Sequence, residues 1–101
     1  MYLTRGINEK MASDLDFSKF IINSMKRFNS RDWGNLCEED KAMNDYAMKH
    51  DNCRIVARYN HMNDMNDIYI MAWRENGKLQ VEILFCSEYW FERTTRIEFL
   101  R

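Results

Sequence analysis

The sequence predicts one α+β domain over residues 1–101, an antiparallel sheet of four to five strands with two helices packed on one face. Its length and its 46% hydrophobic content are those of a chain with a single core. Asn76-Gly77 lies between two alternating apolar runs, the strongest short-range sign of a hairpin. Two segments with helical apolar spacing precede further alternating runs, so the expected order is β-α-α-β-β-β-β.

The hairpin over residues 67–86 organises the prediction. If Asn76 and Gly77 form the loop, Glu75 pairs with Lys78 and the register continues to Ile68 opposite Phe85. One face then carries core side chains. The other face pairs residues that are too apolar to face water uncovered, namely Tyr69 with Leu84, Met71 with Glu82 and Trp73 with Gln80. We expect that face to be covered by residues 89–91 or by a second subunit.

The N-terminal part predicts a strand followed by a helix. Residues 1–7 alternate as a short strand would, with Gly6 permitting a bulge or turn. Ser13 is the expected helix N-cap, and the helix is expected to end near Phe28 or Asn29. Its apolar stripe consists of Phe17, Phe20, Ile21, Ser24, Met25 and Phe28.

A second helix is expected from about Glu38 to Lys49, because acidic residues crowd its first turn and basic residues its last. Its inward stripe is predicted to be Met43, Tyr46, Ala47 and His50. Residues 53–59 and 94–100 alternate as strands, whereas residues 87–93 are ambiguous.

Charge and composition exclude several classes of protein. Fifteen basic and sixteen acidic residues give a net charge of -1, so no global field attracts nucleic acid or an anionic membrane. Three cysteines without framework spacing predict a reduced, cytoplasmic protein. The apolar runs are far shorter than the ~20 residues that cross a bilayer, so no membrane segment is expected.

The potential chemical sites favour a protein that is not an enzyme. Cys37, His50, Cys53 and His61 carry zinc-type donors, but their spacing forms no metal knuckle, so neither metal nor cofactor is expected. Cys37 lies beside three acids, which disfavour its thiolate. No phosphate-binding loop or activated serine motif is present in the sequence.

The acidic residues of the second helix are better explained by the helix dipole than by catalysis, since consecutive carboxylates point in different directions. They are Glu38, Glu39, Asp40 and Asp45. Tyr69 and Trp73, with Arg54 and Arg58 on the neighbouring strand, suggest a stacking platform for single-stranded nucleic acid. The competing interpretation is that this face is simply covered.

A sequence pattern spans the connector and the second helix. Residues 32–40 read D-W-G-x-L-x-x-E-D, and the same pattern includes Asn44-Asp45, Ala47, residues 4–8 (TRGIN) and Glu88-Tyr89. Together they resemble a family of small proteins from plasmids, conjugative elements and phages of Gram-positive bacteria. The chain departs from that family at residues 75–77 and 86–87 and has a longer aromatic tail.

The resemblance implies an interaction protein encoded by a mobile element. Some such proteins are anti-CRISPR inhibitors that bind a type II CRISPR effector nuclease or its guide complex without catalysis. On this hypothesis Glu38, Glu39, Asp40 and Asp45 present carboxylates to an arginine-rich nucleic-acid channel, and Trp33 is the apolar anchor or else a structural plug of its loop. The alternatives are a nucleic-acid-binding accessory protein that uses Tyr69 and Trp73, and a homodimer formed through the hairpin face.

Overall fold

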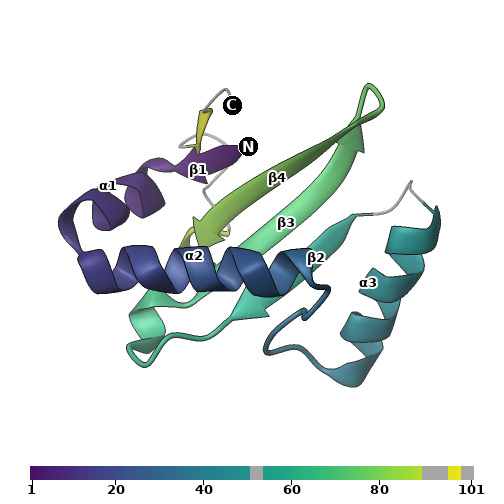
Figure 1. Cartoon of the computed structure of the whole chain (residues 1–101), viewed down its shortest axis with the longest axis horizontal. Helices are drawn as coiled ribbons and strands as arrows, with labels where there is room; N and C mark the ends of the chain where they lie inside the picture. The colour runs from purple at the N-terminus through teal and green to yellow at the C-terminus, as the bar shows by residue number, and fades with distance from the viewer. Residues whose placement is uncertain (51–53, 90–95, 99–101) are drawn as a thin grey trace.

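Five strands form one mixed sheet in the order β2-β3-β4-β1-β5. The computed structural model describes residues 1–50 and 54–89 and the backbone of 96–98. The elements in chain order are β1 (Tyr2–Thr4), α1 (Arg5–Ser13), α2 (Leu15–Asn29), α3 (Glu38–His50), β2 (Ile55–Tyr59), β3 (Ile68–Glu75), β4 (Lys78–Phe85) and β5 (Arg96–Glu98). Two short 3₁₀ helices, η1 (Asp64–Asn66) and η2 (Cys86–Glu88), follow β2 and β4 (Figure 1). The α+β class is confirmed.

The hairpin of β3 and β4 has the predicted register at every pair, from Glu75 opposite Lys78 to Ile68 opposite Phe85. Asn76 and Gly77 both have positive φ, at 54° and 77°, as a type I′ turn requires. Ile68 and Ile70 are fully buried on the predicted core face. β2 pairs antiparallel with β3, which confirms the predicted three-strand meander.

The prediction of a purely antiparallel sheet is wrong. β1 lies between β4 and β5, parallel to the first and antiparallel to the second. A strand of three residues carries too little pattern to specify its neighbours, so tertiary packing decides where it enters the sheet. Residues 53, 94, 95, 99 and 100 of the predicted strands, and residues 90–93, lie outside the described residues.

The predicted N-terminal strand is too long, because a helix that the sequence analysis missed begins directly after Thr4. The Thr4 hydroxyl caps α1 by accepting a hydrogen bond from the Ile7 amide at 3.2 Å. Ser13 is the last residue of α1, and Asp14 instead caps α2 through the Phe17 amide at 3.1 Å. The described part of the chain therefore contains three α-helices, where two were expected.

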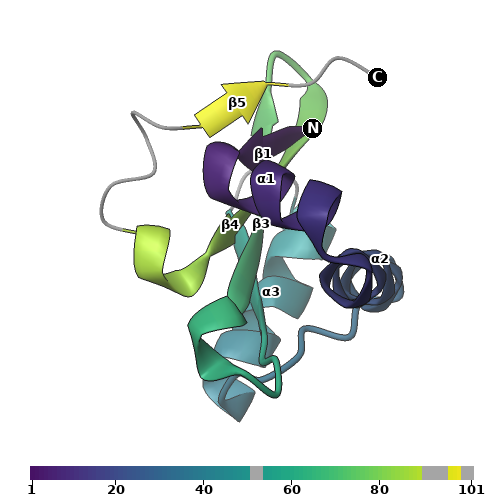
Figure 2. The same ribbon diagram turned by 90° about the vertical axis from the view of Figure 1, so that its left-hand side faces the viewer.

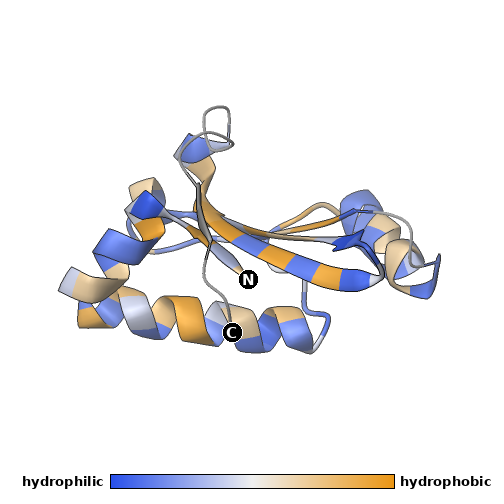
Figure 3. Cartoon of the chain, turned by 90° about the horizontal axis from the view of Figure 1, so that it is seen from above, coloured by the Kyte–Doolittle hydropathy of each residue, from blue (hydrophilic) through white to orange (hydrophobic). Residues whose placement is uncertain are grey.

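Helix α2 covers one face of the sheet and buries Phe17, Ile21 and Phe28 against it (Figure 3). The expectation that a second helix lies on the same face beside it is wrong for α3, which packs against edge strand β2 at one end of the molecule. The stripe predicted to point inward from α3 is also wrong in part. Asn44 and Ala47 are buried, whereas 68% of Met43 and 58% of Tyr46 are exposed.

The second face of the sheet is buried, as its composition predicts. Met71, Glu82 and Leu84 are at most 2% exposed there. Figure 2 shows α2 on one side of the strands and η2 on the other. Tyr89, just after η2, contacts Tyr69 with 5.5 Å between ring centroids. The remaining residues predicted to cover this face, Trp90 and Phe91, lie outside the described residues.

Candidate binding surface of helix α3

The connector between α2 and α3 extends the sheet beside β2. Gly34 forms an isolated parallel bridge with Arg58. The Asn35 amide donates to the Arg58 carbonyl at 2.7 Å, and the Arg58 amide donates to the Trp33 carbonyl at 3.3 Å. Gly34 has a φ of +78°, and a Cβ at this position would lie 1.9 Å from the Arg58 carbonyl oxygen. Only glycine therefore allows the two backbones to approach this closely.

Asn44 completes the cover of the same edge. Its Nδ2 donates to the Val56 carbonyl at 2.9 Å, and its Oδ1 accepts from the Val56 amide at 3.3 Å. An asparagine side chain thus replaces a neighbouring strand at Val56. The exposed backbone of an edge strand invites pairing with other chains, and this arrangement prevents it at Val56 and Arg58.

Trp33 fixes the connector to α2 and α3 and is 3% exposed. Its ring meets Phe28 edge to face at 5.4 Å, and its Nε1 donates to Oδ1 of Asp45 at 2.9 Å. The interpretation of Trp33 as a surface anchor for a partner is therefore wrong, and the interpretation as a structural plug is confirmed. One of the two carboxylate oxygens of Asp45 therefore accepts a hydrogen bond from within the molecule.

The other three predicted acids are exposed on the first turn of α3. Glu38 lies 3.5 Å from Lys41 in a solvent-exposed ion pair, and Glu39 and Asp40 are also exposed. These three residues form what we call the acidic turn. Exposed ion pairs contribute little to stability, so the acidic turn is free to change partners at small cost.

An apolar groove of about 730 Å³ adjoins the acidic turn. Asp40, Met43 and Tyr46 line it on the α3 side. Val56 and Tyr69 line it on the sheet side. The remaining lining residues are Leu36, Ala42, Asn44, Arg54 and Tyr89. Asp40 belongs to both features, so α3 presents carboxylates and an apolar concavity on one continuous surface, which we call the α3 surface.

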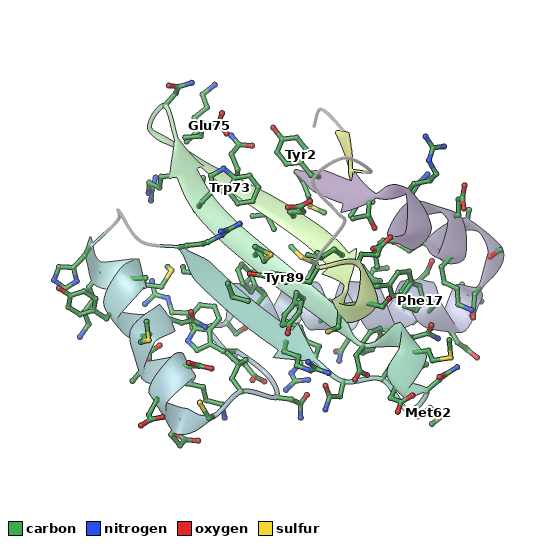
Figure 4. All side chains as sticks on the ribbon, turned by 180° about the vertical axis from the view of Figure 1, so that it is seen from behind. Tyr2, Phe17, Met62, Trp73, Glu75 and Tyr89 are labelled. Carbon is green, nitrogen blue, oxygen red and sulfur yellow. The ribbon has the colours of Figure 1, made fainter. Side chains whose placement is uncertain are left out.

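The two aromatic residues of the predicted stacking platform lie on the same face of β3, and each packs against a different ring. Tyr69 contacts Tyr89. Trp73 stacks on Tyr2 with 6.0 Å between ring centroids (Figure 4). The buried Met71 lies between Tyr69 and Trp73 along β3. Each aromatic ring already packs against another ring. The Trp73 indole also donates to Glu75 at 3.3 Å.

The basic residues expected beside this platform differ in their surroundings. Arg58 lies 3.2 Å from the carboxylate of Asp67, and its guanidinium is 5.6 Å from the centroid of the Tyr69 ring. The charge of Arg58 is therefore matched by a carboxylate that is only 7% exposed. Arg54 is exposed and lines the groove.

The candidate nucleophiles and metal ligands can be located only in part. Burial raises the pKa of the Cys86 thiol to about 11, against the lowering effect of Arg58, so this thiol stays protonated at neutral pH. Within residues 1–50 and 54–89, no group of three His, Cys, Asp or Glu residues could hold a metal ion. Cys53 of the predicted zinc set lies outside the described residues. No helix among the described residues is long and apolar enough to cross a membrane.

The residues that carry the family resemblance form two internal contacts. At the connector, Trp33 donates a hydrogen bond to Asp45, and Gly34 lies against the backbone of Arg58. At the other end of the sheet the Thr4 hydroxyl donates to Oε1 of Glu88 at 2.7 Å, and the same oxygen accepts from the Phe85 amide at 2.9 Å. A Cβ on Gly6 would lie 2.7 Å from the other oxygen of Glu88. Much of the pattern therefore describes structure rather than a contact surface.

Sequence reasoning missed Asn44, Met43 and Tyr46 as residues of this site. Helical spacing suggested Met43 and Tyr46 as core residues because they are apolar, while the buried Asn44 has no apolar signal.

Comparison of the chain with protein-family models, with curated proteins and with solved structures finds no match.

Proposed function

We propose that this chain is a non-catalytic binding protein that inhibits a type II CRISPR effector nuclease through the α3 surface. The observation that supports the proposal is the exposed acidic turn, Glu38, Glu39 and Asp40, beside the apolar groove. The resemblance described above selects the class of partner. The α3 surface suggests how such a partner would be held.

The acidic turn suits a basic partner. Arginine side chains that bind nucleic-acid phosphates also bind carboxylates, often through two parallel hydrogen bonds. Three neighbouring carboxylates would occupy such arginines and so compete with the nucleic acid. Electrostatic attraction of this kind speeds association and weakens at high salt.

The groove supplies the apolar part of the interface. Met43 is flexible and polarisable, and Tyr46 combines a large apolar ring with a hydroxyl, which are properties typical of binding surfaces. An apolar or aromatic side chain of the partner would enter the groove beside the acidic turn. The Trp33–Asp45 hydrogen bond and the Asn44–Val56 pair hold α3 in position, so little ordering is required on binding.

The test mixes the purified chain with a type II effector and its guide RNA, then measures co-elution and cleavage of target DNA. We expect a complex that elutes earlier than the effector alone and cleavage that falls with added chain. A variant that converts Glu38, Glu39 and Asp40 to the matching amides should lose both effects. A control that neutralises the exposed acids Glu9, Asp16 and Asp64 has the same charge change and should keep them.

Unchanged cleavage and elution in the presence of the native chain would contradict the proposal. Loss of inhibition in both triple variants would contradict the role of α3, because net charge rather than position would then matter.

The same samples address the nucleic-acid alternative. Binding of labelled single-stranded DNA or RNA that is lost in Trp73→Ala would favour the sheet face instead.

A further inference from the structure

The outer side of α3 carries a second feature, a stripe of exposed residues opposite the buried Asn44 and Ala47. It consists of Glu39, Ala42, Met43, Tyr46, Lys49 and His50, spaced at three and four residues along the helix. We call it the outer stripe. Figures 1 and 3 show α3 at one end of the molecule.

We propose that two copies of the chain associate through their outer stripes, as an antiparallel pair of α3 helices around a twofold axis. The acid of the stripe, Glu39, lies in the first turn, and its basic residues, Lys49 and His50, lie in the last. An antiparallel pairing centred between Met43 and Tyr46 places Glu39 of one copy opposite Lys49 and His50 of the other. The outer stripe of one copy is therefore complementary in charge to the outer stripe of an antiparallel second copy.

The centre of the stripe is apolar, as a dimer contact requires. Met43 and Tyr46 are 68% and 58% exposed in the single chain. Across the axis the Met43 thioether of one copy faces the Tyr46 ring of the other, a favourable sulfur–aromatic contact. Ala42, next to them, is small and lets the two helices approach closely.

The ring of Tyr46 is already held in place for this contact. It stacks on the His50 ring with 3.9 Å between centroids, and Nδ1 of His50 lies 2.8 Å from the Tyr46 carbonyl oxygen. Little rotamer freedom is then lost when a second copy covers the tyrosine.

The area buried between the two α3 helices sets the affinity expected for the dimer. A single pair of 13-residue helices buries less than the ~1,200 Å² at the lower end of standard interfaces. We therefore expect a weak dimer, populated in the micromolar range and above. The outer stripe shares Glu39 with the acidic turn and shares Ala42, Met43 and Tyr46 with the groove, so a basic partner and a second copy would compete for α3.

The test uses charge reversal and needs no other protein. Sedimentation velocity of the native chain at increasing concentration should show a shift from monomer to dimer. Glu39→Lys and Lys49→Glu each place like charges across the axis, so each variant alone should remain monomeric over the same range. Mixed in equal amounts, the two variants restore opposite charges at both ends of the pair and should form a heterodimer, which sedimentation velocity detects as recovery of the dimer.

A native chain that stays monomeric throughout, single variants that still dimerise, or a mixture that does not recover the dimer would each overturn the proposal. Dimers in both single variants would indicate another face, such as that of the β3–β4 hairpin. Far-UV circular dichroism and thermal unfolding of each variant establish that it is folded. Because no nuclease is present, a failure here leaves the proposed inhibition unaffected.

Discussion

The indole of Trp33 donates its hydrogen bond to the carboxylate of Asp45 at 2.9 Å. The sequence suggests these two residues as parts of a partner-binding surface, and the structure shows that they bind each other. Trp33 is thereby buried between α2 and α3, and the connector is held along edge strand β2. The tryptophan positions the α3 surface without belonging to it.

Replacement of Trp33 by alanine should therefore lower stability. Truncation of a buried aromatic residue typically costs about 3–5 kcal/mol of unfolding free energy. Trp33→Phe should cost less, because it loses the hydrogen bond to Asp45 but keeps most of the ring contact with Phe28. Urea unfolding followed by circular dichroism measures both. A native-like midpoint for Trp33→Ala would contradict the structural role.

Gly34 and Gly77 form a matched pair for testing the connector. Both have positive φ, at 78° and 77°, so alanine strains the backbone similarly at each, by about 1 kcal/mol. Only at Gly34 does a Cβ meet the backbone, because at Gly77 nothing lies within 4 Å. Gly34→Ala should therefore be less stable than Gly77→Ala by about 2 kcal/mol or more in the same urea assay. Equal losses would show that the connector does not need this close approach.

Asn44→Ala should open the sheet edge at one position. It removes two hydrogen bonds and leaves the Val56 amide and carbonyl without their side-chain partners, at a cost of about 1–3 kcal/mol. Amide hydrogen exchange should accelerate at Val56 more than at Ile70, which lies within β3. The exposed Asn23→Ala is the control. Uniform acceleration over the whole sheet would indicate global destabilisation instead.

Asp32 should contribute to the loss of stability in acid. Its hydrogen bond from Arg27 and a second from the Gly34 amide hold the pKa of the Asp32 carboxyl below its ordinary value of 3.8. Because folding lowers this pKa, the Asp32 carboxylate makes its full contribution to stability above pH 3.8. That contribution is lost as the pH falls through the pKa of Asp32 in the folded state. Since the ion pair is half exposed, its contribution is below ~1 kcal/mol. Urea midpoints at pH 5 and pH 2.5 should differ less in Asp32→Asn than in the native chain. If the two proteins show the same difference between these pH values, Asp32 does not contribute to the loss of stability in acid.

Local signals allowed the hairpin to be predicted to the residue. The Asn76-Gly77 turn fixes the register, and each later pair follows from it. The limits of α3 were also predictable, because Glu38 and His50 mark the two ends of its charge pattern. The presence of α1 was not, because this helix has nine residues and only Asp14 separates it from α2.

Long-range contacts account for what the sequence did not show. The parallel pairing of β1 with β4 joins residues about 80 positions apart, as in the pair Leu3 and Ile83. Burial of Asn44 depends on its bonds to Val56, which have no counterpart in hydrophobic periodicity. Because α3 turns Asn44 and Ala47 toward the sheet, Met43 and Tyr46 lie on its exposed side, where they form part of the candidate surface.

The central claim is that the chain binds its partner through α3 rather than through the sheet face. Its most direct test is the dissociation constant for a guide-loaded type II effector, measured by biolayer interferometry for the native chain and for two variants. We expect the variant with amides at residues 38–40 to bind at least about 10-fold more weakly, a loss of about 1.4 kcal/mol, while Trp73→Ala binds like the native chain. Native-like affinity for the residue 38–40 variant together with loss of binding in Trp73→Ala would contradict the account.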